Sequence, residues 1–183
     1  LKELDAIKTN FFTNLSHEFR TPLTLILGPL ENLLDGKVKA DPSSQYQLMY
    51  DHASRLLQLV NQLLDLSSID AGKMKLEIEK YNVVSFVKGI ASSFQHFAEE
   101  KKLSINLSSK SDELPVCFDR DKLQKIISNL LSNAVKFNKE NGSVNISLSE
   151  KMRKGNSFLE IEVEDDGPGM TSEIQKNIFD RFY

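Results

Sequence analysis

The sequence predicts two α-helices that form a hairpin, followed by an α+β two-layer sandwich. In the first seventy residues, apolar side chains recur every three or four positions, which is the period of an α-helix. From Lys73 onward, short segments alternate apolar and polar residues, which is typical of strands with one buried face. We therefore expect a helical domain over residues 1–71 and an α+β domain over residues 72–183.

The first predicted helix runs from about Leu4 to Leu34, and its apolar stripe continues through Pro22 and Pro29. Each proline removes one backbone hydrogen bond, so we expect a kink near each rather than the end of the helix. Gly36 is expected to end it. The stripe consists of Phe12, Leu15, Phe19, Leu23, Ile26, Leu30 and Leu33.

A second helix is predicted to begin at Asp41 or Ser43 and to reach Asp70, with Gly72 ending it. One antiparallel neighbour cannot cover the apolar stripes of both helices. We therefore expect two hairpins to pair as a dimeric four-helix bundle. The stripe of the second helix consists of Met49, Ala53, Leu56, Val60, Leu63 and Leu66.

The second domain is predicted to hold strands over residues 73–79, 103–107, 116–118, 144–148 and 159–163, and helices over residues 84–97 and 120–137. Clean alternation predicts a mixed or antiparallel sheet with its helices on one side. In the helix Arg120–Phe137, the expected buried face consists of Leu123, Ile126, Leu130, Ala134 and Phe137.

Composition argues against several classes of protein. A net charge of −3 gives no electrostatic case for binding nucleic acid. The sequence has no run of eighteen apolar residues, so we expect no membrane contact in this chain. The single cysteine, Cys117, allows no internal disulfide and fits a reducing compartment. Because the chain begins at a leucine and shows no signal peptide, we expect a fragment of a longer protein.

A histidine and a carboxylate, His17 and Glu18, stand side by side within the first helix. At 100° per residue, His17 and Thr21 point away from the apolar stripe, and Glu18 lies on its flank. A neutral imidazole can attack a phosphoryl group, and an adjacent carboxylate can orient it and take its proton. A surface histidine beside an acid is the commoner case, so this motif alone does not decide the function.

The helix Arg120–Phe137 carries two amides and an ammonium on one flank, namely Asn129, Asn133 and Lys136. Taken alone, they are more often a solvated helix edge. The residue types also suit a different role, because amide oxygens bind Mg²⁺ and an ammonium binds phosphate oxygens.

After the last predicted strand comes the glycine-rich run Asp165-Asp166-Gly167-Pro168-Gly169. A turn is the default interpretation. The functional alternative has Asp165 accept a hydrogen bond from an amine such as adenine N6, while Gly167 and Gly169 let the backbone approach a ligand. The sequence contains neither a P-loop nor a dinucleotide-binding glycine fingerprint.

In this order, these stretches resemble the motifs of a sensor histidine kinase of two-component systems, with features of the hybrid type. The resemblance covers essentially the whole chain. Residues 16–23 resemble the H-box, 129–137 the N-box, 165–169 the G1-box and 178–183 the F-box. The fold implied for the second domain is the ATP-binding fold shared with gyrase and chaperone ATPases.

The resemblance implies roles for the candidate residues. His17 would accept the phosphoryl group, Glu18 would act as the base, and Thr21 would help water to dephosphorylate the partner. The implied ATP-site residues are Asn133 as the Mg²⁺ ligand, Asn129 and Lys136 near the phosphates, Phe137 beside the nucleotide, and Asp165 at the adenine with Gly167 and Gly169.

The implied partners are a second copy of the chain and the receiver domain of a response regulator. The implied location is the cytoplasmic portion of an inner-membrane sensor. The family pattern continues past Tyr183 with a lid and a second glycine-rich stretch, so we expect this chain to bind ATP weakly or not at all. Two alternatives stay open: a related ATPase without a phosphoacceptor histidine, and a non-catalytic dimerisation scaffold.

Overall fold

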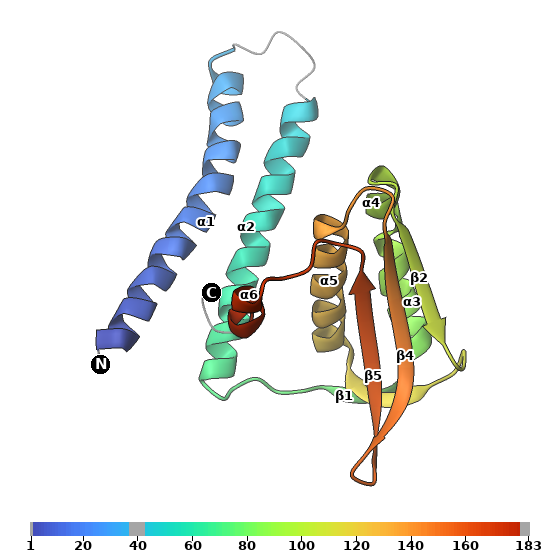
Figure 1. Cartoon of the computed structure of the whole chain (residues 1–183). Coiled ribbons are helices and arrows are strands. Elements are labelled where there is room, and N and C mark those ends of the chain that lie inside the picture. Colours follow the sequence, from blue (N-terminus) through green and yellow to red (C-terminus); the bar gives the residue numbers. More distant parts are fainter. Residues whose placement is uncertain (1, 37–42, 180–183) are drawn as a thin grey trace. The chain divides into compact units, whose positions relative to one another are not determined.

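The computed structural model describes residues 2–36 and 43–179 (Figure 1). These residues fall into two compact units, one holding residues 2–36, 43–75 and 177–179, and the other holding Leu76–Lys176. Each unit is described separately.

The first unit is a hairpin of two long helices, as the apolar period predicts. Helix α1 (Lys2–Leu34) runs without interruption through Pro22 and Pro29, and α2 (Ser43–Asp70) begins at the second of the two predicted positions. The expected start at Asp41 lies outside the described residues. After each helix, a glycine N–H closes the last turn: that of Gly36 donates to the Leu33 carbonyl at 3.2 Å, and that of Gly72 to the Ile69 carbonyl at 2.9 Å.

The hairpin leaves much of its apolar surface uncovered. No residue of α2 is buried. The exposed apolar residues of α2 that share one face, at helical spacing, are Tyr46, Tyr50, Leu57, Val60 and Leu64. Over residues 13–34 of α1, the large apolar residues that are exposed are Leu23, Leu25, Leu27, Leu30 and Leu34.

The second unit contains two small sheets in its described residues. The first pairs two antiparallel strands, and the second is mixed, with order β2-β4-β5, β2 parallel to β4 and β4 antiparallel to β5. The three-stranded sheet confirms the prediction of a mixed or antiparallel sheet. The strands are β1 (Ile78–Asn82), β2 (Ser104–Ser109), β3 (Pro115–Asp119), β4 (Ser143–Arg153) and β5 (Asn156–Asp165).

Four helices accompany the sheets, and α3 and α5 pack against one face of the three-stranded sheet (Figure 1). The buried apolar side chains of α3, α5 and β4 meet there and form the core. The helices are α3 (Val83–Ser93), α4 (Gln95–Glu100), α5 (Arg120–Phe137) and α6 (Ser172–Asn177).

The predicted strand over residues 73–79 is wrong in its position, because β1 begins only at Ile78. Leu76 and Ile78 are 60% and 56% exposed, so the alternation there marks no buried face. The predicted helix over residues 84–97 is also wrong, because it is broken at Phe94 into α3 and α4. The hydroxyls of Ser92 and Ser93 donate to the carbonyls of Lys88 and Ile90 near this break, which is how serine competes with a continuing helix.

The bounds of α5 agree with the prediction, but its predicted buried face is rotated by about one residue. The buried residues are Ile127, Leu131, Ala134 and Val135. Ile126, Leu130 and Phe137 are 55%, 44% and 55% exposed. The helix has apolar residues on two adjacent faces, and only packing against the sheet selects one of them.

Candidate functional site

The side chain of His17 is exposed on α1, on the same outward face as Thr21. The Thr21 hydroxyl donates to the backbone carbonyl of His17 at 3.2 Å. Pro22 has no N–H, so it cannot donate to the carbonyl of Glu18 four residues earlier. No described residue forms a hydrogen bond or ion pair with the imidazole of His17. Its ring nitrogens are therefore available to a reactant from outside the hairpin.

The carboxylate of Glu18 is paired with a residue of the other helix rather than with His17. Its Oε2 lies 3.9 Å from Nη2 of Arg55 on α2. The two side chains are 59% and 64% exposed, so water screens the ion pair. No local pattern in the sequence links Arg55 to Glu18, because the two residues lie on different helices.

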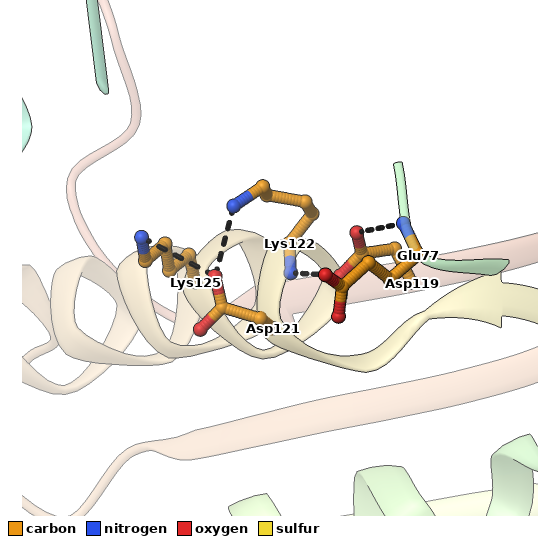
Figure 2. A network of polar contacts seen from close by, with 5 residues as sticks. All are labelled: Glu77, Asp119, Asp121, Lys122 and Lys125. Carbon is orange, nitrogen blue, oxygen red and sulfur yellow. Dashed lines mark hydrogen bonds and ion pairs between the residues drawn. The ribbon is translucent and has the colours of Figure 1, made fainter. Parts of the chain in front are cut away.

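In the second unit, α5 carries most of the predicted ATP-site residues, and Asp119 fixes where this helix begins (Figure 2). Oδ1 of Asp119 accepts the backbone N–H of Lys122 at 3.0 Å and so caps the helix. Oδ2 accepts the backbone N–H of Glu77 at 2.9 Å, which ties the segment before β1 to the same carboxylate. These hydrogen bonds lower the pKa of Asp119 below its ordinary value, and the one from Lys122 has the largest effect.

The first turn of α5 has its own ion pairs, drawn in Figure 2. Asp121 receives the ammonium of Lys122 at 2.9 Å and that of Lys125 at 3.4 Å. The hydrogen bond from Lys122 is the main cause that lowers the pKa of Asp121. An acidic residue in the first turn also complements the positive end of the helix dipole.

The C-terminal end of α5 is held by Lys101. Its ammonium donates to the carbonyl oxygens of Val135 and Lys136 at 3.1 and 3.0 Å. These carbonyls have no partner within the helix, and a cation there complements the negative end of the helix dipole. The ammonium of Lys136 lies 4.9 Å from the ring centre of Phe137, a cation–π distance.

Asn129, Asn133 and Lys136 are all exposed, and they lie on the side of α5 that is about opposite the buried face. Neither amide forms a hydrogen bond with any described residue. Because these amides have no structural partner, they are free to contact a ligand. The cavity of about 530 Å³ between α3 and α5 includes none of the three residues. Lys136 instead lines a smaller cavity of about 370 Å³ at the other end of α5.

The glycine-rich loop after β5 returns to the C-terminal end of α5 (Figure 1). An ideal Cβ on Gly167 would lie 2.9 Å from the carbonyl oxygen of Phe137, so only glycine fits without a shift. Oδ1 of Asp165 accepts the backbone N–H of Gly167 at 2.8 Å. Gly169 has a φ of 71°, in the left-handed region that favours glycine. The structure therefore brings this loop to Phe137.

Asp166 anchors the loop to the start of β4, a role that sequence reasoning missed. Its Oδ2 accepts both the backbone N–H and the hydroxyl of Ser143, at 2.7 and 2.9 Å. The backbone N–H of Ser143 is the main cause that lowers the pKa of this carboxyl. The turn signal Asn141-Gly142 just before Ser143 marks the segment, but no local pattern shows that Asp166 reaches it.

The described residues contain no cluster of three or more histidine, cysteine or acidic side chains that could hold a metal ion. A Mg²⁺ site would therefore depend on phosphate and water oxygens with one or two protein ligands, which is a common arrangement for this ion. The unpartnered amide oxygen of Asn133 fits that donor set. Within the described part of the chain, no helix is long and apolar enough to cross a membrane.

Two family models match the chain. Residues 7–72 match the His Kinase A (phospho-acceptor) domain, and residues 118–183 match the histidine kinase-, DNA gyrase B-, and HSP90-like ATPase.

Curated relatives match almost the whole chain. Hybrid signal transduction histidine kinase D of Dictyostelium discoideum is 40% identical over 100% of this chain and 12% of its own length. The signal transduction histidine-protein kinase BarA of Escherichia coli (strain K12) is 35% identical over 99% of this chain and 20% of its own length. The chain thus spans a fifth or less of these two relatives.

Solved structures with the same fold are also histidine kinases. Acinetobacter baumannii AdeS superposes with a TM-score of 0.72 at 27% identity, covering 90% of this chain and 78% of AdeS. Full-length ShkA in complex with AMPPNP gives 0.63 at 29% identity, covering 88% of this chain and 34% of ShkA. ThkA in complex with the response regulator TrrA gives 0.68 at 20% identity, covering 100% of this chain and 52% of ThkA, and shows the fold alone. The chain therefore belongs to the histidine kinases, with a phospho-acceptor domain followed by an ATPase-type domain.

Proposed function

We propose that this chain is the kinase core of a two-component sensor. In this proposal residues 1–71 dimerise and carry the phosphoacceptor His17, and residues 72–183 bind ATP. The observation that carries it is the exposed imidazole of His17, which has no partner in the described part of the chain and lies within the segment that matches the phospho-acceptor family. The division into domains is supported by the separation of the compact units between Lys75 and Leu76.

In the proposed reaction, the lone pair of one His17 ring nitrogen attacks the γ-phosphorus of ATP. The bond from that phosphorus to the β,γ-bridging oxygen breaks, and ADP leaves. The proton on the other ring nitrogen passes to the Glu18 carboxylate, and the phosphoryl group later moves to an aspartate of a receiver domain. Thr21 is proposed to help water dephosphorylate that partner. Positioning and charge neutralisation supply most of the catalysis in such transfers.

Residues of the second unit are proposed to hold the nucleotide. Asn133 would provide the protein ligand of Mg²⁺, and Asn129 and Lys136 would contact the phosphates. Bound Mg²⁺ supplies neutralisation of the phosphate charge. Asp165 would receive adenine N6 on Oδ2, since the N–H of Gly167 occupies Oδ1. The Phe137 ring, 55% exposed, is available to lie against the nucleotide, beside the close-approaching Gly167 and Gly169.

The proposed partners are a second copy of the chain and a receiver domain. The exposed apolar face of α2 supports the dimer, because apolar helix faces of this extent are normally covered. The receiver is supported by the structural relative ThkA, which is described in complex with a response regulator. We place this core in the cytoplasmic portion of an inner-membrane sensor, because its proposed phosphoryl donor, ATP, is a cytoplasmic nucleotide.

The test is a long incubation of the chain with γ-³²P-ATP and Mg²⁺, followed by identification of the labelled residue. The expected label is acid-labile and alkali-stable, and it disappears in His17→Gln. His96→Gln is the matched control, because His96 is also exposed and lies 3.7 Å from a carboxylate, that of Glu100. ATP turnover that persists in His17→Gln without protein label would indicate an ATPase. Neither label nor turnover under conditions in which the chain binds Mg²⁺-AMPPNP would indicate a dimerisation scaffold.

A further inference from the structure

Arg55 is the partner that the structure gives to Glu18. It is the single Lys or Arg in α2, which spans 28 residues. Its Nη2 lies 3.9 Å from Oε2 of Glu18, so the contact links the two helices of the hairpin next to His17.

Arg55 contacts a carboxylate of α1 and not the nearest carboxylate of its own helix. Asp51, one turn earlier, is the carboxylate that would ordinarily pair with it at this spacing. The structure shows no ion pair between Asp51 and Arg55, and Oδ1 of Asp51 accepts a 2.8 Å hydrogen bond from Nε2 of Gln47. Among the described residues, Glu18 is therefore the carboxylate that is paired with Arg55.

Arg55 contacts only one of the two carboxylate oxygens of Glu18, and this affects the neighbouring His17. Arg55 contacts Oε2, and Oε1 of Glu18 has no partner among the residues that the structure describes. Side chains of adjacent helical residues diverge by about 100°, and a free glutamate samples many rotamers. A base at the position next to His17 must therefore be restrained if it is to stay close to the imidazole.

We infer that Arg55 is a positioning residue for the phosphoacceptor: it holds Oε2 of Glu18 and so keeps Oε1 available for the ring proton of His17. The inference rests on the proposed function, in which Glu18 is the base. Because the ion pair is exposed, its effect is small and depends on ionic strength. Arg55 acts through Glu18 and not on the phosphoryl group itself.

The test uses potassium phosphoramidate, a small phosphoryl donor that requires no ATP site. The His17 nitrogen attacks phosphorus, the P–N bond breaks and ammonia leaves, while the ring proton passes to Glu18. The rates of labelling at His17 and at His96 are measured in the same chain by mass spectrometry of peptides kept at neutral or alkaline pH. His96 thus serves as the internal reference.

The expected result is that Arg55→Met slows labelling of His17 about threefold, as suits a weak exposed pair, and leaves His96 unchanged. Arg55→Lys keeps the charge and restores most of the rate. In a Glu18→Gln background, Arg55→Met has no further effect, which a purely structural role would not explain. Asp51→Asn, which removes a charge one turn away on α2, leaves the rate at His17 unchanged.

Three results would overturn the inference: an unchanged His17 rate in Arg55→Met, a faster rate, or the same threefold loss in the Glu18→Gln background. A wild-type chain labelled at His96 but not at His17 would overturn the proposed function together with the inference. Labelling of wild-type His17 with no dependence on Arg55 would overturn the inference alone.

Discussion

Gly167 lies so close to the end of α5 that an ideal Cβ at this position would be 2.9 Å from the carbonyl oxygen of Phe137. The two residues are 30 positions apart in the sequence, and they join the glycine-rich loop to the helix that carries the exposed amides. The same Cβ would lie 2.5 Å from Oδ1 of Asp165, the residue proposed to contact adenine. A change at Gly167 therefore acts on both parts of the proposed nucleotide site.

Gly167→Ala is expected to weaken nucleotide binding by about tenfold or more, because the loop must move away from Phe137 and carries Asp165 with it. The measurement is an NMR chemical-shift titration with Mg²⁺ and AMPPNP, which detects the weak affinity expected of this chain. Gly89→Ala is the control, since a Cβ there meets nothing within 4 Å, and alanine within a helix is stabilising. Equal affinities in Gly167→Ala and the wild-type chain would contradict the proposed site.

Asn133→Ala is expected to reduce the affinity for Mg²⁺-AMPPNP by at least about tenfold, as loss of a metal ligand or its support does. The thermal midpoint should not fall, because the Asn133 amide has no described partner and alanine is the better helix former. Titration with and without Mg²⁺ separates the metal from the nucleotide. If Asn133→Ala lowers the affinity for AMPPNP equally with and without Mg²⁺, Asn133 is not the Mg²⁺ ligand.

The three long helices of this fold could be predicted well because their signal is local. Apolar period and terminal glycines were enough to place α1 and α2, and the predicted bounds Arg120–Phe137 coincide with those of α5. The buried face of α5 could not be predicted, because Ile126 and Ile127 are equally apolar and only the sheet selects between them.

The connections between distant residues are the part of the site that the sequence could not show. Glu18 looks like a partner of its neighbour His17, yet its ion pair is with Arg55, 37 positions away. Asp166 looks like one residue of a turn, yet it binds the start of β4 at Ser143. Such contacts depend on how the elements pack, so residue types and spacing identify the candidate groups but not their partners.

Acidic substitutions on the exposed apolar face of α2 are expected to dissociate the proposed dimer into monomers. Leu57 and Leu64 are 62% and 59% exposed, and they lie two turns apart on one side of the helix. Burying a leucine contributes about 1.5–3 kcal/mol, so Leu57→Glu with Leu64→Glu should raise the dimer dissociation constant by more than about 100-fold. Light scattering at tens of micromolar measures the mass, with exposed Gln62→Glu as the control. A dimer that persists in the double variant would place the interface elsewhere.

Acidification is expected to destabilise the second unit through Asp119. Because hydrogen bonds from Lys122 and then Glu77 lower the pKa of its carboxyl in the folded state, ionised Asp119 contributes stability above its ordinary value of 3.8. That contribution is lost as the pH falls below 3.8 and through the folded-state value. Asp166, whose pKa is also lowered, acts in the same direction.

Two substitutions at Asp119 separate the charge from the cap. Asp119→Asn keeps one oxygen for the Lys122 N–H but removes the acceptor of the Glu77 N–H, so its melting temperature at pH 7 should lie between those of the wild-type chain and Asp119→Ala. Its melting temperature should also fall less than that of the wild-type chain when the pH is lowered. Asp119→Ala removes the cap and should lower the midpoint at pH 7 by about 3–5 °C. Circular dichroism melts between pH 2.5 and 7 measure both effects, with Glu140→Gln, outside this network, as the control. If the melting temperature falls equally steeply with decreasing pH in Asp119→Asn and in the wild-type chain, other carboxylates cause the acid destabilisation.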